Sequence, residues 1–419
     1  MREMKDSGID WIGEIPKDWV IIKLKYISQF INGYSFDSKD LKVDGIYPVI
    51  RIGDIKNNTI DTKSSLRIAN NMNLNEYRIQ KNDILIAMSG ATVGKSALIA
   101  EDEQAYINQR VGIIRSIYNK YISYSIKTND FMEYIFANNL SSAQQNISQT
   151  LIGDFNIAVP NNDYEYESIV KVLDTKCSEI DSLVEDINSE IKTLEECKKA
   201  VITEAVTKGL NPDAEMKNSG IEWIGEIPKD WEVIKGKYVL KLLKRPITEK
   251  DTVITCFRDG EVTLRSNRRE DGFTMSDKEI GYQGVNTGDL VVHGMDGFAG
   301  AIGISDSRGK ASPVLNVLDS NLNKKYVMYY LRSLAFNNIF TALSTGIRVR
   351  SCDLRWNKLA DLFYTVPPAN VQNEIANFID NKCSEIDSTI ELKKKQVETL
   401  AKYKKSLIYE YVTGKKEVI

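Results

Sequence analysis

Two short stretches of the chain come close to motifs that perform chemistry. Residues 90–96 read Gly-Ala-Thr-Val-Gly-Lys-Ser, and a phosphate-binding loop reads G-x-x-x-x-G-K-[ST]. That loop needs glycine at 89, where this chain has serine, so the stretch is one residue short. Residues 212–217, Pro-Asp-Ala-Glu-Met-Lys, imitate a PD…ExK nuclease pattern. Nuclease carboxylates must converge on a metal from adjacent strands, which six consecutive residues do not allow. The sequence predicts neither nucleotide binding nor nuclease activity.

The reactive side chains are also few. The chain has one histidine, His293, and five cysteines without a C-x-x-C pair. This usage is typical of reduced thiols in a cytoplasmic protein. No catalytic residue, metal site or cofactor is predicted. The first ten residues are polar and no stretch of ~18 apolar residues occurs, so neither a secretory signal nor a membrane span is predicted.

Charge and polar side chains instead indicate a polyanion partner. Residues 20–160 hold 15 Lys+Arg against 13 Asp+Glu, residues 235–365 hold 20 against 14, and residues 161–211 hold 6 against 12. Arginines in the second basic segment suit phosphate and base contacts, with ordinary solvated charge as the alternative. In the first segment a Gly-rich turn with Lys95 and a later Gln/Asn cluster are the matching candidates. The predicted DNA-binding residues are Ser89, Thr92, Lys95, Ser96, Gln144, Gln145, Asn146, Arg265, Arg268, Arg269, Arg348 and Arg350.

An internal repeat organises the chain. Residues 5–19, KDSGIDWIGEIPKDW, and residues 217–231, KNSGIEWIGEIPKDW, agree at 13 of 15 positions. The heptapeptide KCSEIDS occurs at 176–182 and again at 382–388. A period of about 210 residues is too long for a solenoid, so we expect two duplicated domains related by a pseudo-twofold axis.

Each repeat closes with a predicted long helix. Apolar residues recur alternately at four and three positions, which is the coiled-coil period. Lys198, Lys393 and Lys404 interrupt this pattern. Its occurrence in both repeats favours antiparallel packing of the two helices on each other, with two separate surface helices as the alternative. The predicted seam comprises Ile180, Val184, Ile187, Ile191, Leu194 and Val201 in the first helix, and Ile386, Ile390, Val397, Leu400 and Leu407 in the second.

The predicted fold class is α+β, with two duplicated mixed α/β domains separated by two long antiparallel coiled-coil helices. Apolar runs around a Gly-rich turn at 82–99 and 287–304 predict a hairpin in each domain. Helically spaced aromatic residues at 121–139 and 325–343 predict core helices. The predicted boundaries are 1–160 for the leader and first domain, 161–211 for the first helix, 212–368 for the linker, leader and second domain, and 369–419 for the second helix.

With these features the chain resembles the specificity subunit of type I restriction-modification enzymes. The resemblance rests on SGIDWIGEIPKDW and SGIEWIGEIPKDW, the Gly-rich text at 82–97, NQRVG at 108–112 and KCSEID closing each repeat. It covers essentially the whole chain, and Asn82 departs from a glycine common in the family. In that family each variable segment is a target recognition domain, and the helices separate the two domains and dock methyltransferase subunits.

The resemblance implies a DNA-binding subunit without chemistry of its own. Its partners would be double-stranded DNA, the methyltransferase subunits and, through the complex, the restriction and translocase subunits. Two different domains would read a bipartite, asymmetric target through base edges in the major groove. Residues 180–207 would span about 42 Å as a helix, or roughly twelve base pairs. A coiled-coil scaffold with protein-binding ends is the alternative, and salt-dependent DNA binding distinguishes the two.

Overall fold

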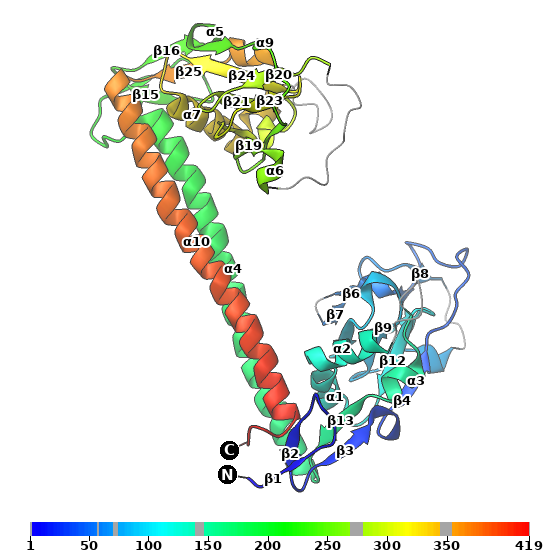
Figure 1. Ribbon diagram of the computed structural model, residues 1–419. Coiled ribbons are helices and arrows are strands. Elements are labelled where there is room, and N and C mark those ends of the chain that lie inside the picture. The colour runs from blue at the N-terminus through cyan, green and yellow to red at the C-terminus, as the bar shows by residue number, and fades with distance from the viewer. Residues whose placement is uncertain are drawn as a thin grey trace. The chain divides into compact units, whose positions relative to one another are not determined.

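The structure is a computed structural model, and it describes residues 2–56, 58–69, 74–138, 146–268, 280–343 and 354–418 (Figure 1). The chain divides into two compact units. Unit 1 comprises Met1–Ile187 with Lys395–Ile419, and unit 2 comprises Asn188–Lys394. Each unit therefore combines one globular segment with part of both long helices.

The two long helices are α4 (Asp163–Lys208) and α10 (Ala369–Val412), which run side by side in Figure 1. Each begins just after a proline turn and stops at a glycine with positive φ, +78° at Gly209 and +69° at Gly414. Glycine adopts this left-handed conformation without steric cost, which ends a helix cleanly. The pairing is antiparallel, because α4 residues Glu190 and Lys198 contact Lys393 and then the earlier Asp387.

Unit 1 is built around a four-stranded antiparallel sheet with the order β10-β9-β12-β4. Its strands are β4 (Gln29–Asn32), β9 (Ile84–Ala87), β10 (Ser96–Leu98) and β12 (Val111–Arg115). Smaller sheets are formed by β1 (Met4–Asp6) with β2 (Glu14–Pro16), by β3 (Val20–Lys23) with β13 (Asn156–Val159), by β5 (Tyr47–Ile50) with β8 (Arg67–Ile68) and β11 (Tyr106–Ile107), and by β6 (Ile55–Lys56) with β7 (Thr59–Ile60). The helices are α1 (Asn119–Ser125), α2 (Asn129–Ala137) and α3 (Gln149–Gly153).

Unit 2 repeats this plan with a four-stranded sheet of order β17-β24-β21-β22. Its strands are β17 (Leu240–Leu242), β21 (Leu290–His293), β22 (Ile302–Ile304) and β24 (Leu315–Ser320). Smaller sheets are formed by β14 (Met216–Asn218) with β15 (Glu226–Pro228), β16 (Glu232–Lys235) with β25 (Phe363–Val366), β18 (Ile254–Cys256) with β19 (Val262–Leu264), and β20 (Gln283–Val285) with β23 (Gly309–Ala311). The helices are α5 (Gly236–Val239), α6 (Arg265–Arg268), α7 (Lys324–Phe336), α8 (Ile339–Ala342) and α9 (Trp356–Asp361).

Strand register fixes which residues of the two units are equivalent. Leu85 of β9 pairs with Ala97 and Ile113, and Val291 of β21 pairs with Gly303 and Val317. Counting along the strands from these residues makes Asp83 equivalent to Asp289, Lys95 to Ala301 and Arg110 to Val314.

Each core joins the globular segment to the helices. In unit 1, Tyr121, Phe131 and Phe155 are buried in the same cluster as Leu173 of α4 and Leu407 of α10. In unit 2, Tyr326 and Tyr330 are buried in the same cluster as Val206 of α4 and Ile379 of α10. The helically spaced aromatic residues thus mainly pack in cores, as their spacing predicted.

Candidate nucleic-acid interface

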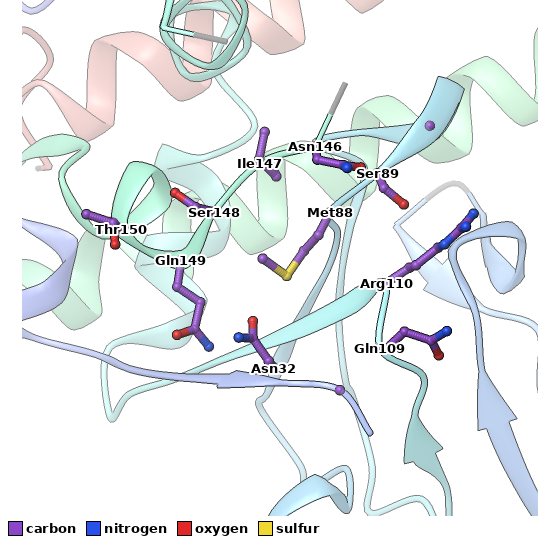
Figure 2. A pocket seen from close by; sticks show the side chains of 12 residues that line it. Asn32, Met88, Ser89, Gln109, Arg110, Asn146, Ile147, Ser148, Gln149 and Thr150 are labelled. Carbon is purple, nitrogen blue, oxygen red and sulfur yellow. The ribbon is translucent and has the colours of Figure 1, made fainter. Parts of the chain in front are cut away.

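A cleft of about 740 Å³ lies at one end of the central sheet of unit 1. Four separate chain segments form it: the end of β4, the turn after β9, the residues before β12, and the residues leading into α3. Figure 2 shows the side chains around it. The lining residues are Asn32, Gly33, Met88, Ser89, Gly90, Gln109, Arg110, Asn146, Ile147, Ser148, Gln149 and Thr150.

Backbone hydrogen bonds hold these segments together. The Met88 amide donates a hydrogen bond to the carbonyl of Arg110, and the Ile147 amide donates one to the carbonyl of Met88. The N···O distance is 2.9 Å in both. Ser89 and Asn146 form a further β-bridge, and the Gly33 amide donates to the carbonyl of Val111. The backbone of the cleft is therefore an extension of the sheet, and it fixes the positions of the Cα atoms from which the lining side chains project.

The lining is polar but carries little charge. Asn32, Gln109, Asn146 and Gln149 bring carboxamide groups, Arg110 brings a guanidinium group, and no lining residue is acidic. Figure 2 shows Asn32 and Gln149 pointing toward each other beside Met88. Carboxamides and guanidinium groups are the side chains that form bidentate hydrogen bonds with purine edges. The cleft therefore has the chemistry to bind nucleobases.

The cleft includes two of the predicted DNA-binding residues, Ser89 and Asn146. Lys95 is exposed at the end of the hairpin between β9 and β10, and Thr92 lies in the same turn. Ser96 is 9% exposed and belongs to β10, so its side chain is poorly placed for a DNA contact. Gln144 and Gln145 lie outside the described residues.

Among the cleft members that sequence reasoning missed are four with carboxamide or guanidinium groups: Asn32, Gln109, Arg110 and Gln149. They come from segments far apart in the chain, and no periodicity marks exposed polar residues at strand ends. NQRVG at 108–112, which contributed to the family resemblance, includes both Gln109 and Arg110. That phrase was the signal available for this part of the site.

The stretch that imitates a phosphate-binding loop is a hairpin turn. Residues Gly90–Thr92 form a short 3-10 helix, and strand β10 follows at Ser96. A phosphate-binding loop instead leads from a strand into a helix, whose N-terminal amides bind phosphate. The geometry of this turn therefore agrees with the prediction made from its missing glycine.

In unit 2, the predicted arginines that the structure describes already have protein partners. The Arg268 guanidinium lies 2.7 Å from Asp259 and 2.8 Å from Glu261, and it covers the ring of Phe257. Arg265 Nε donates to the hydroxyl of Thr255 over 3.4 Å. Arg269, Arg348 and Arg350 lie outside the described residues. The charge of Arg268 is thus balanced within the unit.

Equivalent tyrosines attach each globular segment to the helices. In unit 1 the Tyr121 hydroxyl lies 2.7 Å from the Ala158 carbonyl and 2.9 Å from that of Val412, at the end of α10. In unit 2 the Tyr326 hydroxyl lies 3.2 Å from the Val206 carbonyl, near the end of α4. Burial raises the pKa of both phenols well above their ordinary value. Both tyrosines therefore remain neutral hydrogen-bond donors.

A second pair of contacts repeats in the same way. The Tyr124 hydroxyl donates to Asp174 of α4 over 2.7 Å, and Tyr329 donates to Asp380 of α10 over 2.5 Å. Lys120 and Lys325 form ion pairs with these same aspartates. Burial, together with the hydrogen bond to the carboxylate, raises the pKa of each phenol. The attachment of globular segment to helix is thus built from the same residues in both units.

The predicted helix seam is the covered side of each helix. From Asp181 to Ala200 of α4, the most buried residues are Val184, Ile187, Ile191, Leu194 and Lys198, flanked by Ile180 and Val201. From Ser384 to Ser406 of α10, they are Ile386, Ile390, Lys393, Val397, Leu400 and Lys404, followed by the buried Leu407.

The seam lysines form ion pairs across the helices. Lys198 lies 2.6 Å from Asp387, Lys404 lies 2.6 Å from Asp181, and Lys393 contacts Glu190. The first two pairs are repeat equivalents of each other, because Asp181 and Asp387 hold the same place in KCSEIDS. The lysines that interrupt the apolar pattern therefore support the antiparallel pairing.

Among the described residues, no three His, Cys, Asp or Glu side chains are grouped so that they could bind a metal ion. In the same part of the chain, no helix is long and apolar enough to cross a membrane.

The chain consists of two repeats, each an α+β segment attached to an antiparallel helix pair, and this arrangement is similar to that of a known class of proteins. Residues 16–193 match the family described as the type I restriction modification DNA specificity domain. The MjaVIII specificity subunit of a type I restriction enzyme from Methanocaldococcus jannaschii is 23% identical over 96% of this chain and 93% of its own length. A protein of the same organism named for the MjaX specificity subunit is 27% identical over 96% and 95%.

Solved structures share the fold. A chain from work on the assembly and conformational transition of the type I R-M system has a TM-score of 0.69 at 12% identity, covering 96% of this chain and 99% of that one. The HsdS subunit from Thermoanaerobacter tengcongensis has a TM-score of 0.51 at 11% identity, covering 96% and 98%. Residues 16–193 are therefore similar to the DNA specificity domain family, and nearly the whole chain is similar to type I restriction enzyme specificity subunits.

Proposed function

We propose that this chain is the specificity subunit of a type I restriction-modification complex and that it reads a bipartite, asymmetric DNA target. One half-site is read by each unit. The chain performs no chemistry and acts in the cytoplasm. Methyl transfer, ATP hydrolysis and DNA cleavage belong to partner subunits, and the methyltransferase subunits dock on the long helices.

One observation carries this proposal best: the two units repeat their helix attachments and differ in their polar surfaces. Tyr121 and Tyr326 make equivalent contacts, as do Tyr124 and Tyr329. Unit 1 has a cleft lined by four carboxamides and Arg110. At the position equivalent to Arg110, unit 2 has Val314. Two domains that recognise different half-sites require the same attachment to the helices but different DNA-facing side chains.

A binding measurement with the full chain tests the DNA-binding part. We expect affinity for duplex DNA to fall steeply as salt rises, because contacts with phosphate release counterions. Lys95→Ala should weaken binding to all sequences alike and reduce the salt slope by about one. A protein-binding scaffold would show no salt-dependent binding to DNA. Bound ATP, lost in Lys95→Ala, would instead support a nucleotide-dependent enzyme.

A methylation map of the reconstituted complex tests the bipartite target. With the complete system in cells, methylated sites should share two short motifs separated by a spacer of constant length. A single continuous motif, or no motif, would contradict the proposal.

Shortening the helices tests whether they set that spacer. Removing residues 184–190 together with 390–396 deletes one heptad from each helix. Both residues of the Glu190–Lys393 ion pair are removed, so neither charge is left without its partner. Each helix shortens by about 10 Å, which corresponds to about three base pairs. We expect the two half-sites to persist with a spacer shorter by about that number, and weaker binding because the half-sites also rotate about the duplex axis. An unchanged spacer would show that other parts of the complex set it.

A further inference from the structure

We propose that the cleft of unit 1 reads purine base edges, with Asn32, Gln109 and Gln149 reading adenine and Arg110 reading guanine. The inference rests on the proposed function and assigns the chemistry of one half-site reader. A carboxamide both donates and accepts, and so matches the N6 and N7 groups of adenine. A guanidinium group donates twice, and so matches the O6 and N7 groups of guanine.

The composition of the cleft favours bases over phosphates. Phosphate contacts draw on cations for attraction and on hydroxyl, carboxamide and backbone amide groups for hydrogen bonds, and they carry no sequence information directly. The described lining holds four carboxamides, three hydroxyl groups and a single cation, Arg110, whereas the exposed cation Lys95 lies on the neighbouring hairpin turn. Because no lining residue is acidic, a polyanion can approach without repulsion from the cleft itself. The neutral hydrogen-bonding groups therefore supply specificity, while Lys95 supplies attraction.

The reading side chains are available for a ligand. Asn32, Gln109 and Arg110 are exposed and Gln149 is half-buried. Among the described residues, the hydrogen bonds and ion pairs of unit 1 involve none of these four side chains. A side chain that formed a hydrogen bond or ion pair within the protein would have to break it before it could contact a base. These four require only desolvation and ordering to contact a base.

The floor of the cleft supplies an independent sign of a ligand. Ser89 is 8% exposed, and its hydroxyl oxygen has no hydrogen-bond partner among the residues that the structure describes. A buried hydroxyl group without a partner is costly, so such groups are rare unless a ligand or water completes them. Figure 2 shows Ser89 among the lining side chains, next to Arg110. Met88 beside it offers an apolar surface suited to the methyl group of thymine.

The frame is rigid enough for base recognition. The segments carrying Met88, Arg110 and Ile147 are joined by backbone hydrogen bonds of 2.9 Å. Specific contacts need side chains held by such a frame, because a small displacement breaks bidentate geometry. The cleft therefore combines a fixed backbone with unpaired polar side chains, as a base reader requires.

The decisive experiment maps methylated sites for the full chain assembled with its partner subunits. For Gln109→Ala with Arg110→Ala we expect one or two positions of one half-site to become degenerate, with the other half-site unchanged. Discrimination at those positions should fall roughly 5- to 150-fold, which corresponds to one lost bidentate pair of ~1–3 kcal/mol. Gln104→Ala is the matched control, because Gln104 is an exposed glutamine of unit 1 outside the cleft.

A second variant changes specificity instead of removing it. Gln149→Glu replaces a group that reads adenine with one that only accepts hydrogen bonds, which suits the N4 amino group of cytosine. We expect one adenine of the same half-site to be replaced by cytosine in the methylated motif. This outcome requires a folded protein, so a changed motif supports the inference even if the alanine variants fail to fold.

Three results would overturn the inference. Unchanged motifs in all the cleft variants would show that unit 1 reads its half-site elsewhere, and the proposed function would stand. Equal damage to both half-sites would assign these residues to general binding or to the scaffold. A wild-type complex without any methylated motif would overturn the proposed function and, with it, this inference.

Discussion

The two units hold equivalent aspartates in place with arginines from different strands. In unit 1, Asp83 before β9 pairs with Arg115 at the end of β12, over 2.7 Å. In unit 2, the equivalent Asp289 before β21 contacts Arg245, which follows β17. Both aspartate side chains are nearly fully buried, 2% and 4% exposed, and each also accepts a bond from a backbone amide. Each unit thus has its own buried aspartate at the equivalent position, but the arginine that pairs with it lies at a different position.

A glycine explains why the partner changed place. The strand register makes Gly33 the unit 1 equivalent of Arg245. A Cβ atom at Gly33 would lie 2.0 Å from the carbonyl oxygen of Asn108, so no side chain fits there. Unit 1 instead carries arginine at 115, where unit 2 has Asp319. Both units therefore pair the buried aspartate with an arginine, but the arginine comes from a different part of the sheet in each unit.

Positions in the cleft and on the adjoining hairpin turn diverge more than the scaffold positions. Unit 2 has Met295 at the equivalent of Ser89, Ala301 at that of Lys95 and Val314 at that of Arg110. The tyrosine and aspartate contacts with the helices are unchanged. The repeat therefore preserves the contacts that position each segment on the helices and varies the residues in and beside the cleft.

Breaking the aspartate pairs should have the largest effect on stability. Arg115→Ala leaves Asp83 buried and unpaired, and we expect a loss of about 3 kcal/mol for unit 1. Arg245→Ala should do the same in unit 2. Hydrogen exchange resolved along the chain is the measurement, because two units need not unfold together. Faster exchange should be confined to the unit that carries the change.

A transplant sharpens this prediction. Gly33→Arg added to Arg115→Ala places the cation where unit 2 has it, yet the contact with Asn108 prevents an undistorted fit. We expect no recovery of protection in β9 and β12. Full recovery would show that the backbone at Gly33 yields easily, and that the arginine changed place for another reason.

Removing the tyrosine hydroxyls should have a smaller and equal effect in the two units. Tyr121→Phe leaves the Val412 carbonyl without that donor, and Tyr326→Phe does the same for Val206. We expect each change to cost about 1–3 kcal/mol, seen as faster exchange in the last turn of α10 for the first variant and of α4 for the second. Clearly unequal losses would contradict the view that the units share one attachment.

The scaffold could be predicted from the sequence, whereas the site could be predicted only in part. Seam residues such as Ile187 and Val397 recur at a regular spacing, and two glycines mark the helix ends, so local pattern sufficed. Asn32 and Gln149 meet only because β4 and α3 adjoin in the folded unit. Arg268 suggested a DNA contact, yet Asp259 and Glu261 lie close enough in sequence to have indicated an internal ion pair. Clustered arginines do not by themselves show which charges remain free.

Charge exchange across the helices tests the seam. Lys198 and Asp387 are 29% and 55% exposed, so their attraction is screened and contributes about 0.5 kcal/mol. Asp387→Lys should destabilise the helix pair slightly, and Lys198→Asp in the same chain should restore it. The same exchange at Lys404 and Asp181 should give an equal coupling energy in a double-mutant cycle followed by thermal unfolding. No coupling at either pair would show that apolar packing alone determines the register.

The smallest predicted effect concerns the one histidine, which marks another difference between the units. His293 ends β21 where unit 1 has Ala87 at the end of β9. Its Nδ1 atom accepts hydrogen bonds from the backbone amides of Met295 and Asp296, over 3.2 and 3.0 Å. A protonated imidazole could not accept them.

The pKa of His293 is lowered below its ordinary 6.5, first by burial, and the nearby Arg258 adds to this while Asp296 opposes it. As pH falls through 6.5 the unfolded chain takes up a proton that the folded unit refuses, so the stability of unit 2 declines until the folded pKa is reached. Above about pH 7.5 the stability should not depend on this group. His293→Ala should remove the decline, and unit 1 should show none over the same range. Because the chain has a single histidine, its imidazole resonances report the folded pKa directly by NMR. A folded pKa at or above 6.5 would mean that Asp296 outweighs burial, and that the turn of unit 2 tolerates a charged imidazole.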